Sequence, residues 1–108
     1  MQKGKRARLE AAGWVVGTAR EFLGLSDAEA ALIETKILLS RALRARRRRQ
    51  RLSQEELARR LRSSQSRVAK MEAGDPSVSM DLLVRSLFVL GASSDDLARA
   101  IRAGHRAA

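Results

Sequence analysis

The side chains with the clearest chemical signal are arginines, which cluster near the middle of the chain. Six of the eight positions from 44 to 51 are arginine, namely Arg44, Arg46, Arg47, Arg48, Arg49 and Arg51. A solvated helix end is one interpretation, because the negative end of a helix dipole favours cations. Six like charges repel one another, however, and an anion nearby explains them more easily. We therefore expect Arg48 and Arg49 to bind phosphate groups.

A second group of polar side chains lies in residues 65–73, which are expected to form a helix. At about 100° per residue, Val68 and Met71 point to one side of it, toward Leu57 and Leu61. The opposite face has no acid and carries Ser66, Ala69, Lys70 and Ala73, flanked by Gln65 and Arg67. Small residues let a helix approach the floor of the DNA major groove, where Gln, Ser, Arg and Lys supply donors to base edges and phosphates. An ordinary solvated face is the alternative, but the arginine run and the short preceding helix favour DNA binding.

The composition supports a polyanionic partner and argues against catalysis. The 108 residues include 22 Lys and Arg against 12 Asp and Glu, a net charge of +10. Nucleic acid is the first candidate partner and an anionic membrane the second. The chain has no cysteine and one histidine, His105, which excludes disulfides, thiolate zinc sites and cysteine nucleophiles and disfavours a histidine-based metal site. We therefore expect no enzymatic activity, no metal and no cofactor.

A membrane location is not expected. No apolar run approaches the roughly 20 residues of a membrane-spanning helix, and no apolar segment of signal-peptide length follows the basic N-terminus. The basic run also lacks the Trp- and Phe-rich opposite face of helices that lie on membrane surfaces. These features predict a cytoplasmic, nucleoid-associated protein.

Helix-capping pairs predict the elements that position these side chains. A Ser or Thr followed three residues later by an acid is typical of helix starts, and such pairs are Thr18 with Glu21, Ser26 with Glu29, Ser53 with Glu56, and Ser93 with Asp96. Together with apolar periodicity and Gly or Pro stops, they predict helices over about 18–23, 27–50, 54–61, 65–73, 80–90 and 94–102. No useful β-alternation is present, so the fold is expected to be all-α.

The spacing of the two central helices is the most informative feature of this pattern. A helix of eight residues, a turn of three and a helix of nine must cross steeply, as in a helix-turn-helix. Such a pair cannot bury its own apolar face. It therefore needs the helix before it and the two helices after it to complete a core.

Residues 52–74 (LSQEELARRLRSSQSRVAKMEAG) closely resemble the XRE/Cro-type, or phage-repressor-like, helix-turn-helix family. The positions that match the family pattern are Leu52, Ser53, Gln54, Leu57, Ala58, Gln65, Ser66, Val68, Met71, Glu72 and Gly74. The resemblance covers about residues 37–101 and implies a five-helix DNA-binding domain, which we assign to residues 37–103. It implies a sequence-specific transcriptional regulator that binds double-stranded DNA as a homodimer, on two half-sites about one helical turn apart. The dimer would form through the last helix (Leu97, Ile101), through the N-terminal extension, or through both.

The resemblance also implies roles for single residues. Gln54, which opens the first helix of the motif, would contact a phosphate. The remaining DNA contacts would come from the start of the second helix, the recognition helix, and are assigned to Ser64, Gln65, Ser66, Arg67 and Lys70. Gln65 and Ser66 would meet base edges, Arg67 a phosphate or neighbouring base, and Lys70 would lie one turn further along.

Three further positions concern structure rather than DNA contact. By the same resemblance, Arg47 and Glu72 would form a structural ion pair, so Glu72 is not expected to act as a catalytic acid. The family usually has glycine at the first residue of the turn, where this chain has Arg62. A non-glycine residue with positive φ costs on the order of 1 kcal/mol. Either the turn differs slightly here or the strain is accepted.

The N-terminal third lies outside this motif. Residues 1–12 are expected to form a basic, flexible tail, and residues 13–36 a helical extension that packs on the core or in a dimer interface. The extension resembles the leader of some small XRE-type regulators, including HigA-like antitoxins. The alternative function is therefore an antitoxin that represses its own operon and neutralises a toxin protein by direct binding.

Overall fold

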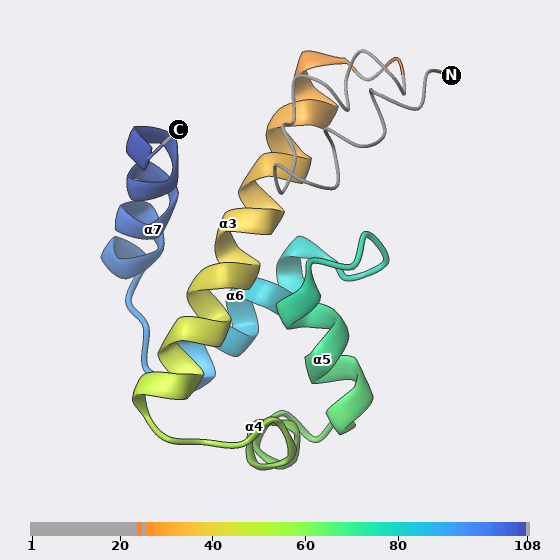
Figure 1. Ribbon diagram of the computed structural model, residues 1–108, viewed down its shortest axis with the longest axis vertical. Helices are drawn as coiled ribbons and strands as arrows, with labels where there is room; N and C mark the ends of the chain where they lie inside the picture. Colours follow the sequence, from red (N-terminus) through yellow and green to blue (C-terminus); the bar gives the residue numbers. More distant parts are fainter. Residues whose placement is uncertain (1–23, 25, 108) are drawn as a thin grey trace. The chain divides into compact units, whose positions relative to one another are not determined.

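The computed structural model describes residue 24 and residues 26–107. This part of the chain contains five α-helices and no strand: α3 (Asp27–Arg49), α4 (Gln54–Leu61), α5 (Gln65–Ala73), α6 (Met80–Val89) and α7 (Ser94–Ala107) (Figure 1). The expected all-α class is thereby confirmed. The predicted tail at 1–12 lies outside the described residues, as does half of the predicted extension at 13–36, including the capping pair of Thr18 and Glu21.

The chain divides into two compact units, Met1–Thr35 and Lys36–Ala108. Helix α3 contributes residues to both units. The second unit contains the C-terminal part of α3 and all of α4 to α7. It therefore holds both the arginine run and the two short central helices.

Local hydrogen bonds start the helices at the predicted capping pairs. At α4, the Ser53 hydroxyl oxygen accepts the Glu56 N–H at 3.0 Å, and Glu56 Oε1 accepts the Ser53 N–H at 2.8 Å. The same reciprocal bonds form at the starts of α3 and α7, between Ser26 and Glu29 and between Ser93 and Asp96. Each pair satisfies two backbone donors, one of them an N–H that the first helical turn would leave without a partner.

The last helix is longer than predicted, because α7 continues to Ala107 instead of ending near residue 102. A glycine inside a helix costs about 1 kcal/mol relative to alanine, and α7 contains one at Gly104. A Cβ atom at this position would overlap the Leu38 side chain of α3. Glycine therefore allows α7 to pack closely on α3, and this tertiary contact explains why the helix continues through it.

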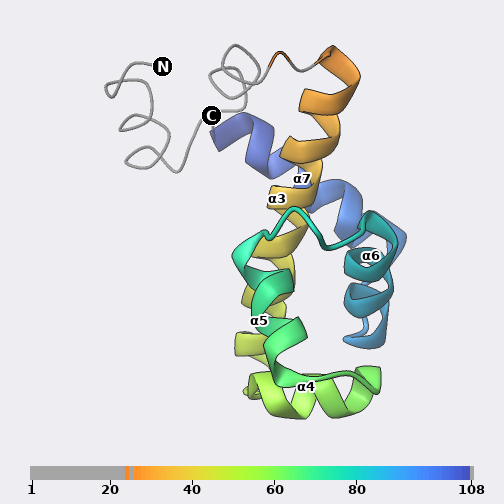
Figure 2. The same ribbon diagram turned by 90° about the vertical axis from the view of Figure 1, so that its right-hand side faces the viewer.

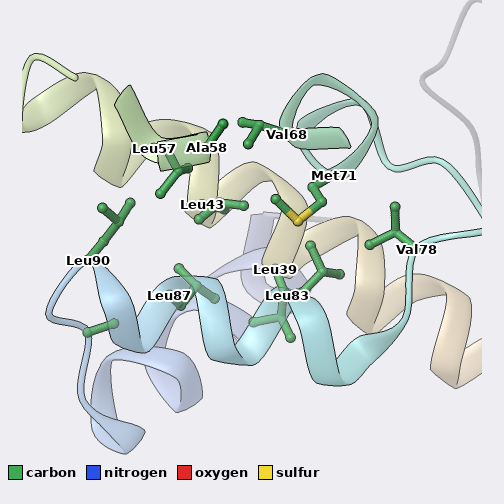
Figure 3. Close-up of a cluster of buried hydrophobic side chains, with 11 residues drawn as sticks. Leu39, Leu43, Leu57, Ala58, Val68, Met71, Val78, Leu83, Leu87 and Leu90 are labelled. Carbon is green, nitrogen blue, oxygen red and sulfur yellow. The ribbon is translucent and has the colours of Figure 1, made fainter. Parts of the chain in front are cut away.

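The core of the second unit lies between α3, α4, α5 and α6 (Figure 3). Its buried hydrophobic residues are Leu39, Leu43, Leu57, Ala58, Val68, Met71, Val78, Leu83, Leu87, Leu90 and Ala92. Val68 and Met71 of α5 are fully buried, as the helical periodicity predicted. Burying a side chain of this size stabilises a fold by about 1.5–3 kcal/mol. The core therefore determines which face of α5 remains exposed.

Helices α4 and α5 cross steeply, as predicted; in Figure 2, α4 runs across the view and α5 runs upward from it. The turn between them is closed by the Ser63 N–H, which donates to the Ala58 carbonyl oxygen at 2.8 Å. Arg62 has φ 54° and ψ 47°, a left-handed conformation. The sequence left open whether the turn differs here or the strain is accepted. The structure accepts the strain and keeps a left-handed residue at this position of the turn.

Candidate nucleic-acid interface

The N-terminal end of α5 presents polar side chains to solvent. Gln65, Ser66, Arg67 and Lys70 are exposed together with the N-cap residue Ser64, and the first turn contains no acid. The Ser64 hydroxyl oxygen accepts the Arg67 N–H at 3.2 Å and so starts the helix. Because the opposite face of α5 is buried in the core, the helix cannot rotate without exposing apolar side chains. The structure thus brings these candidate contact residues together at one exposed helix end.

A chain of hydrogen bonds, here termed the polar relay, connects this helix end to α4 and α3. Gln65 Nε2 donates to Gln54 Oε1 at 2.6 Å, and Gln54 Nε2 donates to Glu72 Oε1 at 3.1 Å. Glu72 also accepts two bonds from Arg47, at 2.5 Å from Nε and 2.9 Å from Nη2. Arg47 Nη1 donates to the Leu52 carbonyl oxygen at 2.7 Å. The relay brings Arg47 and Glu72 together as an ion pair and gives Gln54 a positioning contact that the sequence did not indicate.

Glu72 is ionised in the polar relay although its side chain is only 3% exposed. Burial by itself raises the pKa of Glu72, because it disfavours the charged form. The hydrogen bonds from Arg47 and Gln54, together with the positive charge of Arg47, outweigh burial and lower the pKa of Glu72 from its ordinary value. The hydrogen bond to Glu72 in turn raises the pKa of Arg47. The pair is therefore charged at neutral pH and anchors α5 to α3.

The arginines of α3 divide between two sides of the helix. Arg44 and Arg48 line a hollow of about 290 Å³ beside the polar relay, together with Ala69 and Ala73 of α5. Arg49 instead lines a different hollow, against α7. Adjacent residues of a helix diverge by about 100°, and here that divergence places Arg48 and Arg49 against different neighbours. The structure therefore brings Arg48 beside α5, does not bring Arg49 there, and adds Arg44.

Sequence reasoning missed a further group of polar residues on the other side of α5. Ser77 and Ser79, which precede α6, line a hollow of about 550 Å³ with Arg67 and Lys70. The Asp75 carboxylate orders this loop, since its Oδ1 accepts bonds from the N–H and hydroxyl of Ser77 at 2.8 and 2.7 Å. The available signal was a run of small polar residues directly before a helix start, where backbone N–H groups favour anions.

Neither a membrane span nor a metal-binding cluster is found in the described part of the chain. Within residues 24 and 26–107, no helix combines the length and apolar character needed to cross a bilayer. In the same described ranges, no three His, Cys, Asp or Glu side chains come together in a way that could hold a metal ion.

Comparison with known proteins identifies the domain. No curated protein and no solved structure matches the chain significantly. A family model described as a helix-turn-helix domain matches residues 38–100, which is more than half of the chain. The match begins in α3 and ends in α7, so it includes the α4–α5 pair and the helices that complete its core. The chain belongs to the helix-turn-helix family, as its resemblance to XRE/Cro-type regulators indicated.

Proposed function

We propose that this protein is a sequence-specific regulator of transcription that binds double-stranded DNA with α5 in the major groove. The observation that carries the proposal is the polar relay, which holds the exposed Gln65 in one orientation. One N–H of the Gln65 amide is engaged by Gln54. The oxygen and the second N–H of the Gln65 amide remain available to DNA. An amide oxygen and N–H are the two groups that pair with N6 and N7 of adenine. Such a regulator acts at the nucleoid in the cytoplasm and needs no metal, cofactor or catalytic group.

Cations on both sides of α5 support this docking. Arg44 and Arg48 lie on the side of the polar relay, and Arg67 and Lys70 lie toward the loop before α6. A helix in the major groove lies between two phosphate backbones about 12 Å apart. In this docking, each group of cations faces one of the two strands. Phosphate contacts would set the register of the protein, and Gln65 would read the sequence.

Selection of bound sequences from random double-stranded DNA tests the proposal. We expect the wild-type protein to enrich a defined site containing an A·T pair that depends on Gln65. Loss of one good base contact costs about 1–3 kcal/mol on the preferred site, so Gln65→Ala should reduce specific affinity about tenfold and leave binding to random DNA nearly unchanged. Its melting temperature should change little, because Gln65 is exposed.

Val68→Ala is the matched control, because Val68 lies on the buried face of the same helix. Val68→Ala should lower the melting temperature of the protein. The fraction of this variant that folds should still select the same DNA sequence as the wild type. An unaltered site preference in Gln65→Ala, Ser66→Ala and Lys70→Ala would show that α5 does not read DNA.

We further propose that the regulator binds a palindromic operator as a homodimer. One recognition helix contacts few base pairs, and two half-sites one helical turn apart supply the missing specificity. Phe88 and Val89, at the C-terminal end of α6, are 47% and 41% exposed, whereas Leu97 and Ile101 of α7 are partly buried against the core. The exposed pair favours the end of α6 as the dimer contact. Sedimentation analysis should show a dimer for the wild type and a monomer for Phe88→Glu, and a monomeric wild type on DNA would contradict the proposal.

The second candidate function, an antitoxin, depends on a protein-binding surface outside the matched domain. Leu32, which lies in the first unit, is 50% exposed and is an apolar contact available to a protein partner. Co-expression with the product of the neighbouring gene tests this candidate. An antitoxin should restore growth inhibited by that product, and Leu32→Asp should abolish the rescue without changing DNA binding. Failure of the wild-type protein to rescue growth would contradict the antitoxin function and leave transcriptional regulation as the proposed function.

A further inference from the structure

A hollow of about 310 Å³ lies on the α7 side of α3, separate from the residues assigned to DNA. Its apolar surface comes from Ala42, Ala45, Leu87, Ala92, Leu97 and Ala100. Four of these six side chains are alanine, and larger side chains at the same positions would fill the space. The volume lies at the lower end of the range of small-molecule sites, about 300–1,000 Å³. The shape therefore suits one small apolar group.

Charged side chains around this hollow are mainly cationic. Arg46, Arg49 and Arg99 contribute three positive charges, and Asp96 contributes one negative charge, which leaves a net charge of +2 (3 − 1). The charges of the lining are therefore not balanced, and a bound anion would balance them. A small molecule that carries an anionic group on an apolar body would match both parts of the lining.

The existing ion pairs leave two of these arginines available. Asp96 Oδ2 accepts the Ser93 N–H at 2.8 Å, and Asp96 also pairs with Arg99. Arg46 reaches the same Oδ2 only at 3.3 Å, longer than the 2.7–2.9 Å or so of a good charged hydrogen bond. Within the described residues, the guanidinium of Arg49 has no hydrogen bond or ion pair. Both groups can thus accept a better anionic partner without breaking a strong contact.

We propose that this hollow is a binding site for a small aliphatic carboxylate. Its carboxylate would accept hydrogen bonds from Arg46 and Arg49, and its hydrocarbon part would cover the alanine and leucine surface between α3 and α7. Arginine suits this role because its planar fork binds both oxygens of a carboxylate. The inference explains why Arg49 points away from the DNA-binding side of α3. Ligand binding by itself does not depend on the proposed function, and the experiment below contains no DNA.

Titration calorimetry with octanoate tests the proposal on the full chain. We expect saturable binding of one octanoate per chain and no saturable binding of octan-1-ol, which has the same chain length without the charge. Arg49→Gln should weaken octanoate binding about tenfold, the usual effect of losing one charged hydrogen bond. Ala45→Leu should abolish binding by filling the hollow, and its exposed position predicts a normal fold. Arg48→Gln, on the other side of α3, is the matched control and should bind octanoate as the wild type does.

Three results would overturn the proposal. The first is the absence of saturable octanoate binding to the wild type at millimolar concentration. The second is unchanged binding in both Arg49→Gln and Ala45→Leu, which would place the ligand elsewhere. The third is conversion of a dimer to monomers by octanoate or by Ala45→Leu, which would identify the hollow as a contact between two copies of the chain. Methyl chemical shifts of Ala42 and Ala100 in the wild type give an independent readout, since octanoate in the hollow must shift both.

Discussion

Replacement of Arg47 tests the polar relay most directly. Glu72 accepts hydrogen bonds from three donor nitrogens, two of them on Arg47 and one on Gln54. Arg47→Met removes two of these bonds and the positive charge, and leaves a carboxylate that is 3% exposed with one neutral donor. Breaking a buried ion pair by removing one partner costs about 3–5 kcal/mol. Because whole domains are stable by only about 5–15 kcal/mol, this loss should be obvious in urea unfolding followed by circular dichroism.

The pH dependence of this loss has a definite sign. In the wild type the folded-state pKa of Glu72 is lowered, so its contribution to stability is present above the unfolded-state pKa and is lost as pH falls through the folded one. In Arg47→Met, burial without the counter-charge should instead raise the folded-state pKa. The folded variant then gains relative stability as the pH falls through that pKa, and its deficit against the wild type should narrow in acid.

A second variant separates the unpaired charge from lost packing. Arg47→Met combined with Glu72→Gln removes the buried charge, so it should recover most of the stability at pH 7 and lose the pH dependence. The reasoning fails if Arg47→Met costs less than about 1 kcal/mol, or if the double variant is no more stable than the single one.

Three further predictions concern single positions. Arg62→Gly should raise the free energy of unfolding by about 1 kcal/mol, because glycine relieves the left-handed strain at φ 54°; an unchanged urea midpoint would mean that the turn is not strained. Arg48→Ala should reduce the slope of log DNA affinity against log salt concentration by about 0.9. Arg49 faces α7, so Arg49→Ala should leave the slope unchanged; equal effects would contradict the placement of Arg48 and Arg49 on different sides of α3. The Cβ of Gly104→Ala should force the Leu38 side chain to move, a cost of about 1–3 kcal/mol that the roughly 1 kcal/mol higher helix propensity of alanine partly offsets; Leu38→Ala in the same chain should relieve the clash.

The candidate site was only partly predictable. Gln65, Ser66 and Lys70 follow from the periodicity of one short helix, since Val68 and Met71 must be buried and the opposite face must then be exposed. The polar relay did not follow, because the contact of Gln65 with Gln54 depends on how α4 and α5 cross. The contribution of Ser77 and Ser79 depends in the same way on where the loop before α6 returns to α5.

Local physics determined the helices of the described chain. A capping pair joins residues three apart, so Ser53 with Glu56 and Ser93 with Asp96 form the same bonds wherever the chain folds. Tertiary structure decided what local spacing leaves open. It kept Arg62 in a strained conformation, since the surrounding turn and core over-determine that backbone. It also placed Arg48 beside α5 and Arg49 beside α7, because a long helix has different neighbours on its different sides. The arginine run itself does not indicate which neighbour each side chain will contact.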